Sequence, residues 1–97
     1  STDTAAVLRG AEIGADVVLM AKNIDAIYTD DPRKNPDAKK LSEVDYDYIL
    51  KNHLSAIDTC AASFAMDNHM KLHIFGLDDS ENIYRGIMGE KIGTIVD

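Results

Sequence analysis

The pattern of apolar and polar positions predicts a helix at the start of the chain, followed by a strand. Thr2 or Asp3 is a suitable N-cap for the helix, and Gly14 supplies its stop. The apolar side of this predicted helix consists of Ala5, Ala6, Leu8 and Ile13. Residues 16–20 (DVVLM) then form a short, almost entirely apolar run, which predicts a strand covered on both faces.

The rest of the chain alternates in the same way after a polar, proline-containing loop at residues 28–40. In order, the pattern predicts a helix over 44–53 capped by Asp45, a helix over 55–70, a strand over 71–77, a helix over 78–91 that begins with capping residues and ends at Gly89, and a strand over 92–96. The residues of the 55–70 helix expected to face inward are Ile57, Cys60, Ala61 and Phe64. Strands separated by helices predict the α/β class with a mainly parallel sheet.

The predicted sheet is small for its class. Its three strands are fewer than a doubly wound sheet usually has. Their apolar character implies cover on both faces and partners at the edges. The chain also begins without a methionine. We therefore expect residues 1–97 to be an incomplete domain whose remaining sheet lies upstream.

Composition and charge argue against several classes of function. The net charge of −7 and the scattered lysines and arginines disfavour a nucleic-acid partner. No apolar run approaches the roughly 20 residues of a membrane span, so no membrane partner is expected. Cys60 is the only cysteine, which rules out an internal disulfide and fits a reducing cytoplasm. Its setting, DTCAASF, predicts packing in the core rather than reactivity.

The common catalytic and metal-binding motifs have no match. The phosphate loop G-x-x-x-x-G-K-[ST] and the nucleophile motif G-x-S-x-G are both absent. Gly86, Gly89 and Gly93 are spaced as helix ends and turns rather than as a dinucleotide fingerprint. His69 and His73 fall on either side of a predicted helix–strand junction, so a shared zinc site is not expected.

The start of the first predicted helix is one candidate binding segment. Ser1, Thr2 and Asp3 lie where free backbone N–H groups and the helix dipole favour an anion. Plain N-capping also explains a Thr-Asp start. Both interpretations stay open on the pattern alone.

The segment that follows the first predicted strand is the second candidate. It leaves the carboxyl end of a parallel strand, where open α/β sheets bind ligands. Tyr28 can pack against a flat base, Asp31 can accept hydrogen bonds from a ribose, and Asn23 can pair with a base edge. A solvated turn that uses Asp and Pro for their backbone preferences is an equally good explanation.

Four stretches together carry a family resemblance. They are STDTAAVLRGAEIGADVVLMAKN, DAIYTDDPRKNPDAKK, AIDTCAASFAMDN and IYRGIMGEKIGTIV. In order and spacing they span nearly the whole chain, which resembles the carboxyl-terminal part of bacterial uridylate kinases (UMP kinases), in the amino-acid kinase superfamily. The resemblance implies an α/β/α sandwich and a nucleoside monophosphate kinase that transfers the γ-phosphoryl of ATP to UMP in pyrimidine nucleotide biosynthesis. It also implies Mg²⁺ bound with ATP, and a cytoplasmic homohexamer.

The resemblance also assigns residues. The implied ATP contacts are Asn23, Tyr28 and Asp31, and the implied UMP contacts are Ser1 and Thr2. Asp3 matches an acid that orients phosphate-binding lysines in related amino-acid kinases. The family usually has Asp-Gly where this chain has Asp25-Ala26, and the stretch before it is one residue shorter here. Lys22 is therefore an alternative to Asn23 as the ATP contact.

The part of the family pattern that lies upstream holds the glycine-rich loop, the phosphate-binding lysine and most of the UMP pocket. Phosphoryl transfer depends on such cationic groups, so we expect residues 1–97 alone to be inactive. Two other functions remain open. One is a superfamily member that phosphorylates a carbamate or a carboxylate, and the other is a non-catalytic nucleotide-binding or assembly module.

Overall fold

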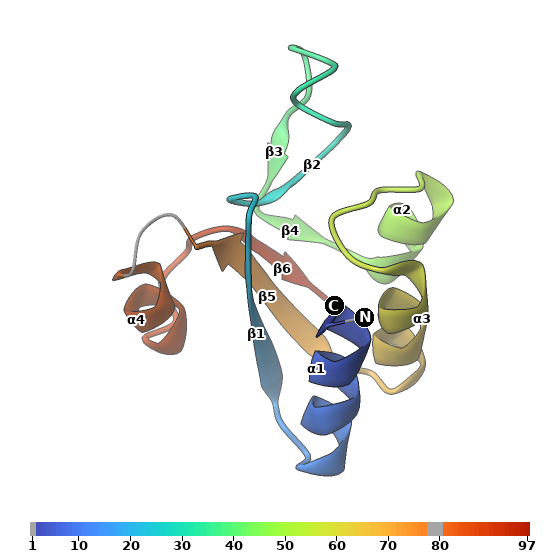
Figure 1. The fold of residues 1–97 in the computed structure, drawn as a ribbon, viewed down its shortest axis with the longest axis vertical. Helices are drawn as coiled ribbons and strands as arrows, with labels where there is room; N and C mark the ends of the chain where they lie inside the picture. Colours follow the sequence, from blue (N-terminus) through green and yellow to red (C-terminus); the bar gives the residue numbers. More distant parts are fainter. Residues whose placement is uncertain (1, 78–80) are drawn as a thin grey trace.

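The computed structural model describes residues 2–77 and 81–97 as an α/β fold (Figure 1). Ser1 and the expected capping residues of the last helix, 78–80, lie outside the described residues. The elements in chain order are α1 (Thr2–Glu12), β1 (Val17–Lys22), β2 (Ile27–Tyr28), β3 (Lys40–Leu41), β4 (Glu43–Val44), α2 (Tyr46–Lys51), α3 (Thr59–Asp67), β5 (Lys71–Gly76), α4 (Glu81–Ile87) and β6 (Thr94–Val96).

The main sheet has the strand order β1-β5-β6-β4. β1 pairs with β5 in parallel, β4 pairs with β6 in parallel, and β5 and β6 are antiparallel. The predicted α/β class with a mainly parallel sheet is thus confirmed. The short strands β2, β3 and β4 were not predicted, because two-residue strands leave no readable alternation in a sequence.

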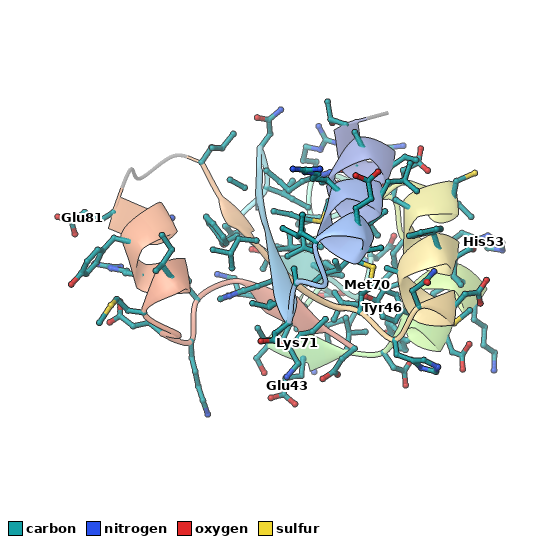
Figure 2. All side chains as sticks on the ribbon, turned by 90° about the horizontal axis from the view of Figure 1, so that it is seen from below. Glu43, Tyr46, His53, Met70, Lys71 and Glu81 are labelled. Carbon is teal, nitrogen blue, oxygen red and sulfur yellow. The ribbon has the colours of Figure 1, made fainter. Side chains whose placement is uncertain are left out.

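Helices cover the sheet from both sides. Viewed from below, α1 and α3 lie on one side of the sheet and α4 lies on the other (Figure 2). The hydroxyl of Tyr46, at the start of α2, donates a hydrogen bond of 2.7 Å to the carbonyl oxygen of Met70, which precedes β5. β5 is the most enclosed strand, with Leu72 to Gly76 all buried. The core therefore lies between β5 and the α1–α3 layer.

Some predicted helix ends are confirmed, but Thr2 and Asp3, predicted as N-caps, both lie within α1. Asp45 caps α2 by accepting a hydrogen bond from the backbone N–H of Tyr48. Gly14 ends the first helical segment with a φ of +65°. The second long helix begins later than predicted, at Thr59, because Asp58 accepts hydrogen bonds from two backbone N–H groups of its first turn. Ile57 is buried as expected, but it lies before the helix.

The predicted apolar side of α1 was wrong. Leu8 and Ile13 are 42% and 63% exposed, whereas Val7 and Gly10 are buried. The helix packs closely on β1 through its glycine, where a Cβ on Gly10 would lie 2.5 Å from Cγ2 of Val18. This close approach turns Val7 inward and leaves Ala5, Leu8 and Ile13 exposed, while Ala6 stays half-buried.

Two further expectations about burial were wrong. Cys60 is exposed, because the inward side of α3 consists of the small residues Ala61, Ala62 and Ala65. β1 is not fully covered, since Val17 is 40% exposed at its start. β1 is the first strand in the sheet order and pairs only with β5 among the described residues, which leaves its outer side less enclosed.

No helix within residues 2–77 and 81–97 has both the length and the apolar character that a membrane span requires.

Candidate functional site

An ion pair joins the start of α1 to the end of β1. Nζ of Lys22 donates hydrogen bonds to Oδ1 and Oδ2 of Asp3 at 2.8 and 3.0 Å. Oδ2 of Asp3 also accepts a hydrogen bond of 2.9 Å from the backbone N–H of Asp58, immediately before α3. The backbone N–H of Leu77, directly after β5, donates a hydrogen bond of 2.8 Å to the carbonyl oxygen of Lys22. One carboxylate therefore ties two helix starts to the carboxyl end of a strand.

The environment of Asp3 keeps this carboxylate ionised. The residue is only 8% exposed, and its burial alone would raise its pKa. The hydrogen bond from the Lys22 ammonium, the hydrogen bond from Asp58 and the positive charge of Lys22 outweigh that effect, so the pKa of Asp3 lies below its ordinary value of 3.8. At neutral pH the pair is thus an aspartate held against an ammonium group.

A cavity of about 370 Å³ opens directly on this ion pair. Its lining residues are Thr2, Asp3, Ala6, Leu19, Met20, Ala21, Lys22, Asn23 and Leu77. It lies at the carboxyl ends of the paired strands β1 and β5, which is the position where open parallel sheets bind ligands. The cavity combines an apolar wall from the sheet with polar groups from the two chain segments that the sequence had singled out.

β2, β3 and the segment between them form an arm, residues 27–41. The arm extends away from the main sheet at the top of Figure 1. Tyr28 and Lys40 are register partners at its base. The hydroxyl of Tyr28 donates to Asp25 at 3.0 Å, and Nζ of Lys40 lies 2.6 Å from the same carboxylate. The hydrogen bond from Lys40 holds the pKa of Asp25 below its ordinary range, although partial burial opposes this. The phenol of Tyr28 is therefore anchored to the base of the arm.

Asp31 organises the turn of the arm. Its Oδ1 accepts hydrogen bonds from the backbone N–H and from Nε of Arg33, at 2.9 and 3.3 Å. Its carbonyl oxygen also accepts from the backbone N–H groups of Lys34 and Asn35. This is the local Asp-Pro turn chemistry that the sequence indicated. The hydrogen bond from the backbone of Arg33 contributes most to lowering the pKa of Asp31.

The structure brings together some of the predicted site residues and separates others. Thr2, Asp3 and Asn23 line one cavity, so the helix start and the strand-end segment converge there. Tyr28 and Asp31 lie on the arm and do not line that cavity. Their assignment to ATP therefore stays a prediction, as does that of Thr2 to UMP.

Lys22 is the residue whose importance sequence reasoning underestimated. It was considered only as an alternative to Asn23, yet both residues line the cavity and Lys22 provides the ammonium group that pairs with Asp3. A lysine that ends an otherwise apolar strand is the signal that could have identified it.

Ala26 stands where the family pattern has glycine, and it is fully buried. Apart from glycines, only His53 and His69 have a positive φ in the part of the chain that the structure describes, so the backbone of Ala26 does not need the conformation that favours glycine.

The two histidines considered for zinc are separated as predicted. α3 ends at Asp67 and β5 begins at Lys71, so His69 lies in the turn between them and His73 lies on β5. His73 is buried, and its Nε2 lies 2.6 Å from the carbonyl oxygen of Ile92. Within residues 2–77 and 81–97, no group of three or more His, Cys, Asp or Glu side chains is placed to hold a metal ion.

The fold and the cavity at its strand ends define the class of this protein. The sequence model of the amino acid kinase family matches residues 1–76. That match covers most of the chain, including α1, β1, the arm and β5. The chain belongs to the amino acid kinase family.

Solved structures refine this assignment. UMP kinase from Bacillus anthracis has 30% sequence identity to the chain and a TM-score of 0.93, and the match covers 100% of this chain and 40% of that one. UMP kinase from Ureaplasma parvum has 30% identity and a TM-score of 0.89, covering 100% of this chain and 42% of that one. Uridylate kinase from Archaeoglobus fulgidus has 29% identity and a TM-score of 0.84, covering 100% and 47%. The chain therefore spans less than half the length of these structures and is similar to UMP kinases throughout, which confirms the resemblance seen in the sequence.

Proposed function

We propose that residues 1–97 form the carboxyl-terminal, ATP-binding portion of a UMP kinase domain. The full-length protein, meaning the polypeptide that contains this portion, would transfer the γ-phosphoryl of ATP to UMP and release UDP and ADP. The observation that carries the proposal is the Asp3–Lys22 pair, which opens on a cavity at the carboxyl ends of β1 and β5 in a fold similar to UMP kinases.

The chemistry of the pair supports phosphoryl transfer. The transferring group carries negative charge on its oxygens, and a fixed cation stabilises that charge in the transition state. A flexible lysine at a strand end would lose much of this effect, but two hydrogen bonds to Asp3 restrict the Lys22 ammonium. We assign Asp3 as the residue that positions Lys22, and Lys22 as a cation that faces the phosphates.

The placement of the other predicted residues fits two substrates that meet at this cavity. Thr2, assigned to UMP, and Asn23, assigned to ATP, line the same cavity from different segments. Tyr28 lies at the base of the arm and Asp31 at its turn, and there they would hold the adenosine end of ATP. We propose that Mg²⁺ enters with ATP and is bound mainly through its phosphates, as is usual for this ion in kinases.

Substrate dependence tests the proposal. The full-length protein, supplied with Mg-ATP, should release ADP only when a nucleoside monophosphate acceptor is present, and UMP should be the best acceptor. An assay that couples ADP release to NADH oxidation measures this directly. ADP release that depends on carbamate or on a carboxylate, and not on UMP, would instead assign the protein to another branch of the family.

A further inference from the structure

A buried hydroxyl links the arm to the main sheet. Thr94 begins β6 and has no exposed surface. Its Oγ1 accepts a hydrogen bond of 2.8 Å from the backbone N–H of Ile27 and donates one of 2.5 Å to the carbonyl oxygen of Leu41. Ile27 and Leu41 are register partners of β2 and β3, so one side chain bonds both strands at the base of the arm.

These two hydrogen bonds help to fix the base of the arm. β2 and β3 have two residues each, and so short a pair has little stability by itself. Ala26 and Ile27, at the start of the arm, are buried at 0% and 1% exposure, so their backbone polar groups need partners within the protein. A hydroxyl can donate once and accept, and Thr94 uses both capacities here.

The backbone before Thr94 is shaped to bring it to this place. Gly93 has a φ of +63°, and a Cβ at that position would overlap the carbonyl oxygen of Ile74 on β5. A residue with a side chain would therefore push the start of β6 away from β5. Thr94 itself pairs with Ile74 in the sheet, so its hydroxyl has a fixed position relative to β5.

We propose that Thr94 is a positioning residue for the nucleotide-binding arm. This role rests on the proposed function, in which the arm holds ATP. Thr94 acts through the backbones of Ile27 and Leu41 on the orientation of Tyr28 and Asp31, and thereby on ATP affinity. Tyr28 directly follows Ile27, so the direction of its ring depends on how the base of the arm is held. UMP affinity is expected to be nearly independent of Thr94, because Thr2 belongs to α1 and is not part of the arm.

Two comparisons in the full-length protein isolate the hydroxyl, one of Thr94→Val with the wild type and one of Thr94→Ser with Thr94→Ala. Thr94→Val keeps the shape and loses both hydrogen bonds, while Thr94→Ser and Thr94→Ala differ from each other only in the hydroxyl. Loss of the hydroxyl should raise KM for ATP about three- to tenfold, which corresponds to one or two hydrogen bonds. KM for UMP should change less than about twofold, and Thr94→Ser should resemble the wild type.

A second readout does not require activity. Arg33 and Lys34 lie on the arm and are exposed, so trypsin can cleave there when the arm opens. Thr94→Val and Thr94→Ala should be cleaved at these residues several times faster than the wild type and Thr94→Ser. If the wild type proves not to phosphorylate UMP, the proposed function fails while this cleavage pattern still tests the role of Thr94. Equal cleavage rates in all four proteins, or equal changes in both KM values, would overturn the proposal, and the Ser/Ala pair decides it if Thr94→Val does not fold.

Discussion

The carboxylate of Asp3 holds the ammonium group of Lys22 at 2.8 and 3.0 Å, although the two residues are nineteen positions apart. The family resemblance implied that Asp3 orients phosphate-binding lysines. In the structure the lysine that Asp3 holds is Lys22, from β1 of the same chain. The pair thus joins the two segments, α1 and the end of β1, that line the candidate site.

Removing the charge of Asp3 tests whether it positions Lys22. Asp3→Asn keeps the size of the side chain and an oxygen for the Asp58 N–H, but it weakens the hold on Lys22. In the full-length protein we expect kcat to fall about 10- to 100-fold, as for misplaced catalytic groups. The melting temperature should fall only slightly, by the small stability that the ion pair contributes. Asp16→Asn, at an exposed acid between α1 and β1, is the matched control and should leave both values unchanged. An unchanged kcat in Asp3→Asn would leave Asp3 with only a structural role, as a link between α1, β1 and the start of α3.

The same pair should contribute to stability in a defined pH range. The pKa of Asp3 is lowered in the folded protein, so its contribution is fully present above its ordinary pKa of 3.8. It is lost as the pH falls through the lower pKa of the folded state. Urea unfolding of the wild type and Asp3→Asn should therefore show a constant difference in unfolding free energy near neutral pH, which shrinks below pH 3.8. A difference that grows on acidification would have the wrong sign for this ion pair.

The sequence predicted the order of the long elements because their apolar runs and caps are local signals. Asp45, Gly14 and the apolar strand at 71–77 each predicted a feature that the structure contains. The face of α1 could not be predicted in the same way. Apolar residues occur around much of that helix, and the close contact of Gly10 with Val18, a tertiary feature, decides which of them are buried.

The candidate site was predictable in part for a similar reason. Thr2, Asp3 and Asn23 were selected from their positions at a helix start and a strand end, and the structure places them around one cavity. Lys22 was underestimated because its partner, Asp3, is distant in sequence and only the packing of α1 on β1 brings them together. The role proposed for Thr94 was not foreseen for the same reason, since its partners lie 67 and 53 positions away.

The arm residues should affect ATP more than UMP. In the full-length protein, Tyr28→Ala and Asp31→Ala should each raise KM for ATP about two- to tenfold, because each loses one contact to a neutral part of the ligand. Tyr28→Phe keeps the ring and removes only the hydrogen bond to Asp25, so its KM for ATP should stay close to the wild-type value. Steady-state kinetics with each substrate varied in turn measure the difference. Equal increases in both KM values would count against the assignment of the arm to ATP.

Two glycines with positive φ should respond very differently to alanine. Gly93 has a φ of +63° and no room for a Cβ beside Ile74, whereas Gly14 has a φ of +65° and nothing within 4 Å of that position. Gly14→Ala should cost about 1 kcal/mol, the conformational penalty alone. Gly93→Ala should cost at least about 1 kcal/mol more, because β6 must also move away from β5. Chemical denaturation of both variants checks this, and equal losses would contradict the close packing described for Gly93.

The most direct test of the whole account compares acceptors and chain lengths in one assay. ADP release from Mg-ATP is measured for the full-length protein with UMP, with other nucleoside monophosphates, and with carbamate and simple carboxylates. The account predicts turnover with UMP by the full-length protein and none above background by residues 1–97 alone, which lack the upstream phosphate-binding groups implied by the family. Turnover by residues 1–97 alone, or a full-length protein that phosphorylates a carbamate or carboxylate and not UMP, would contradict it.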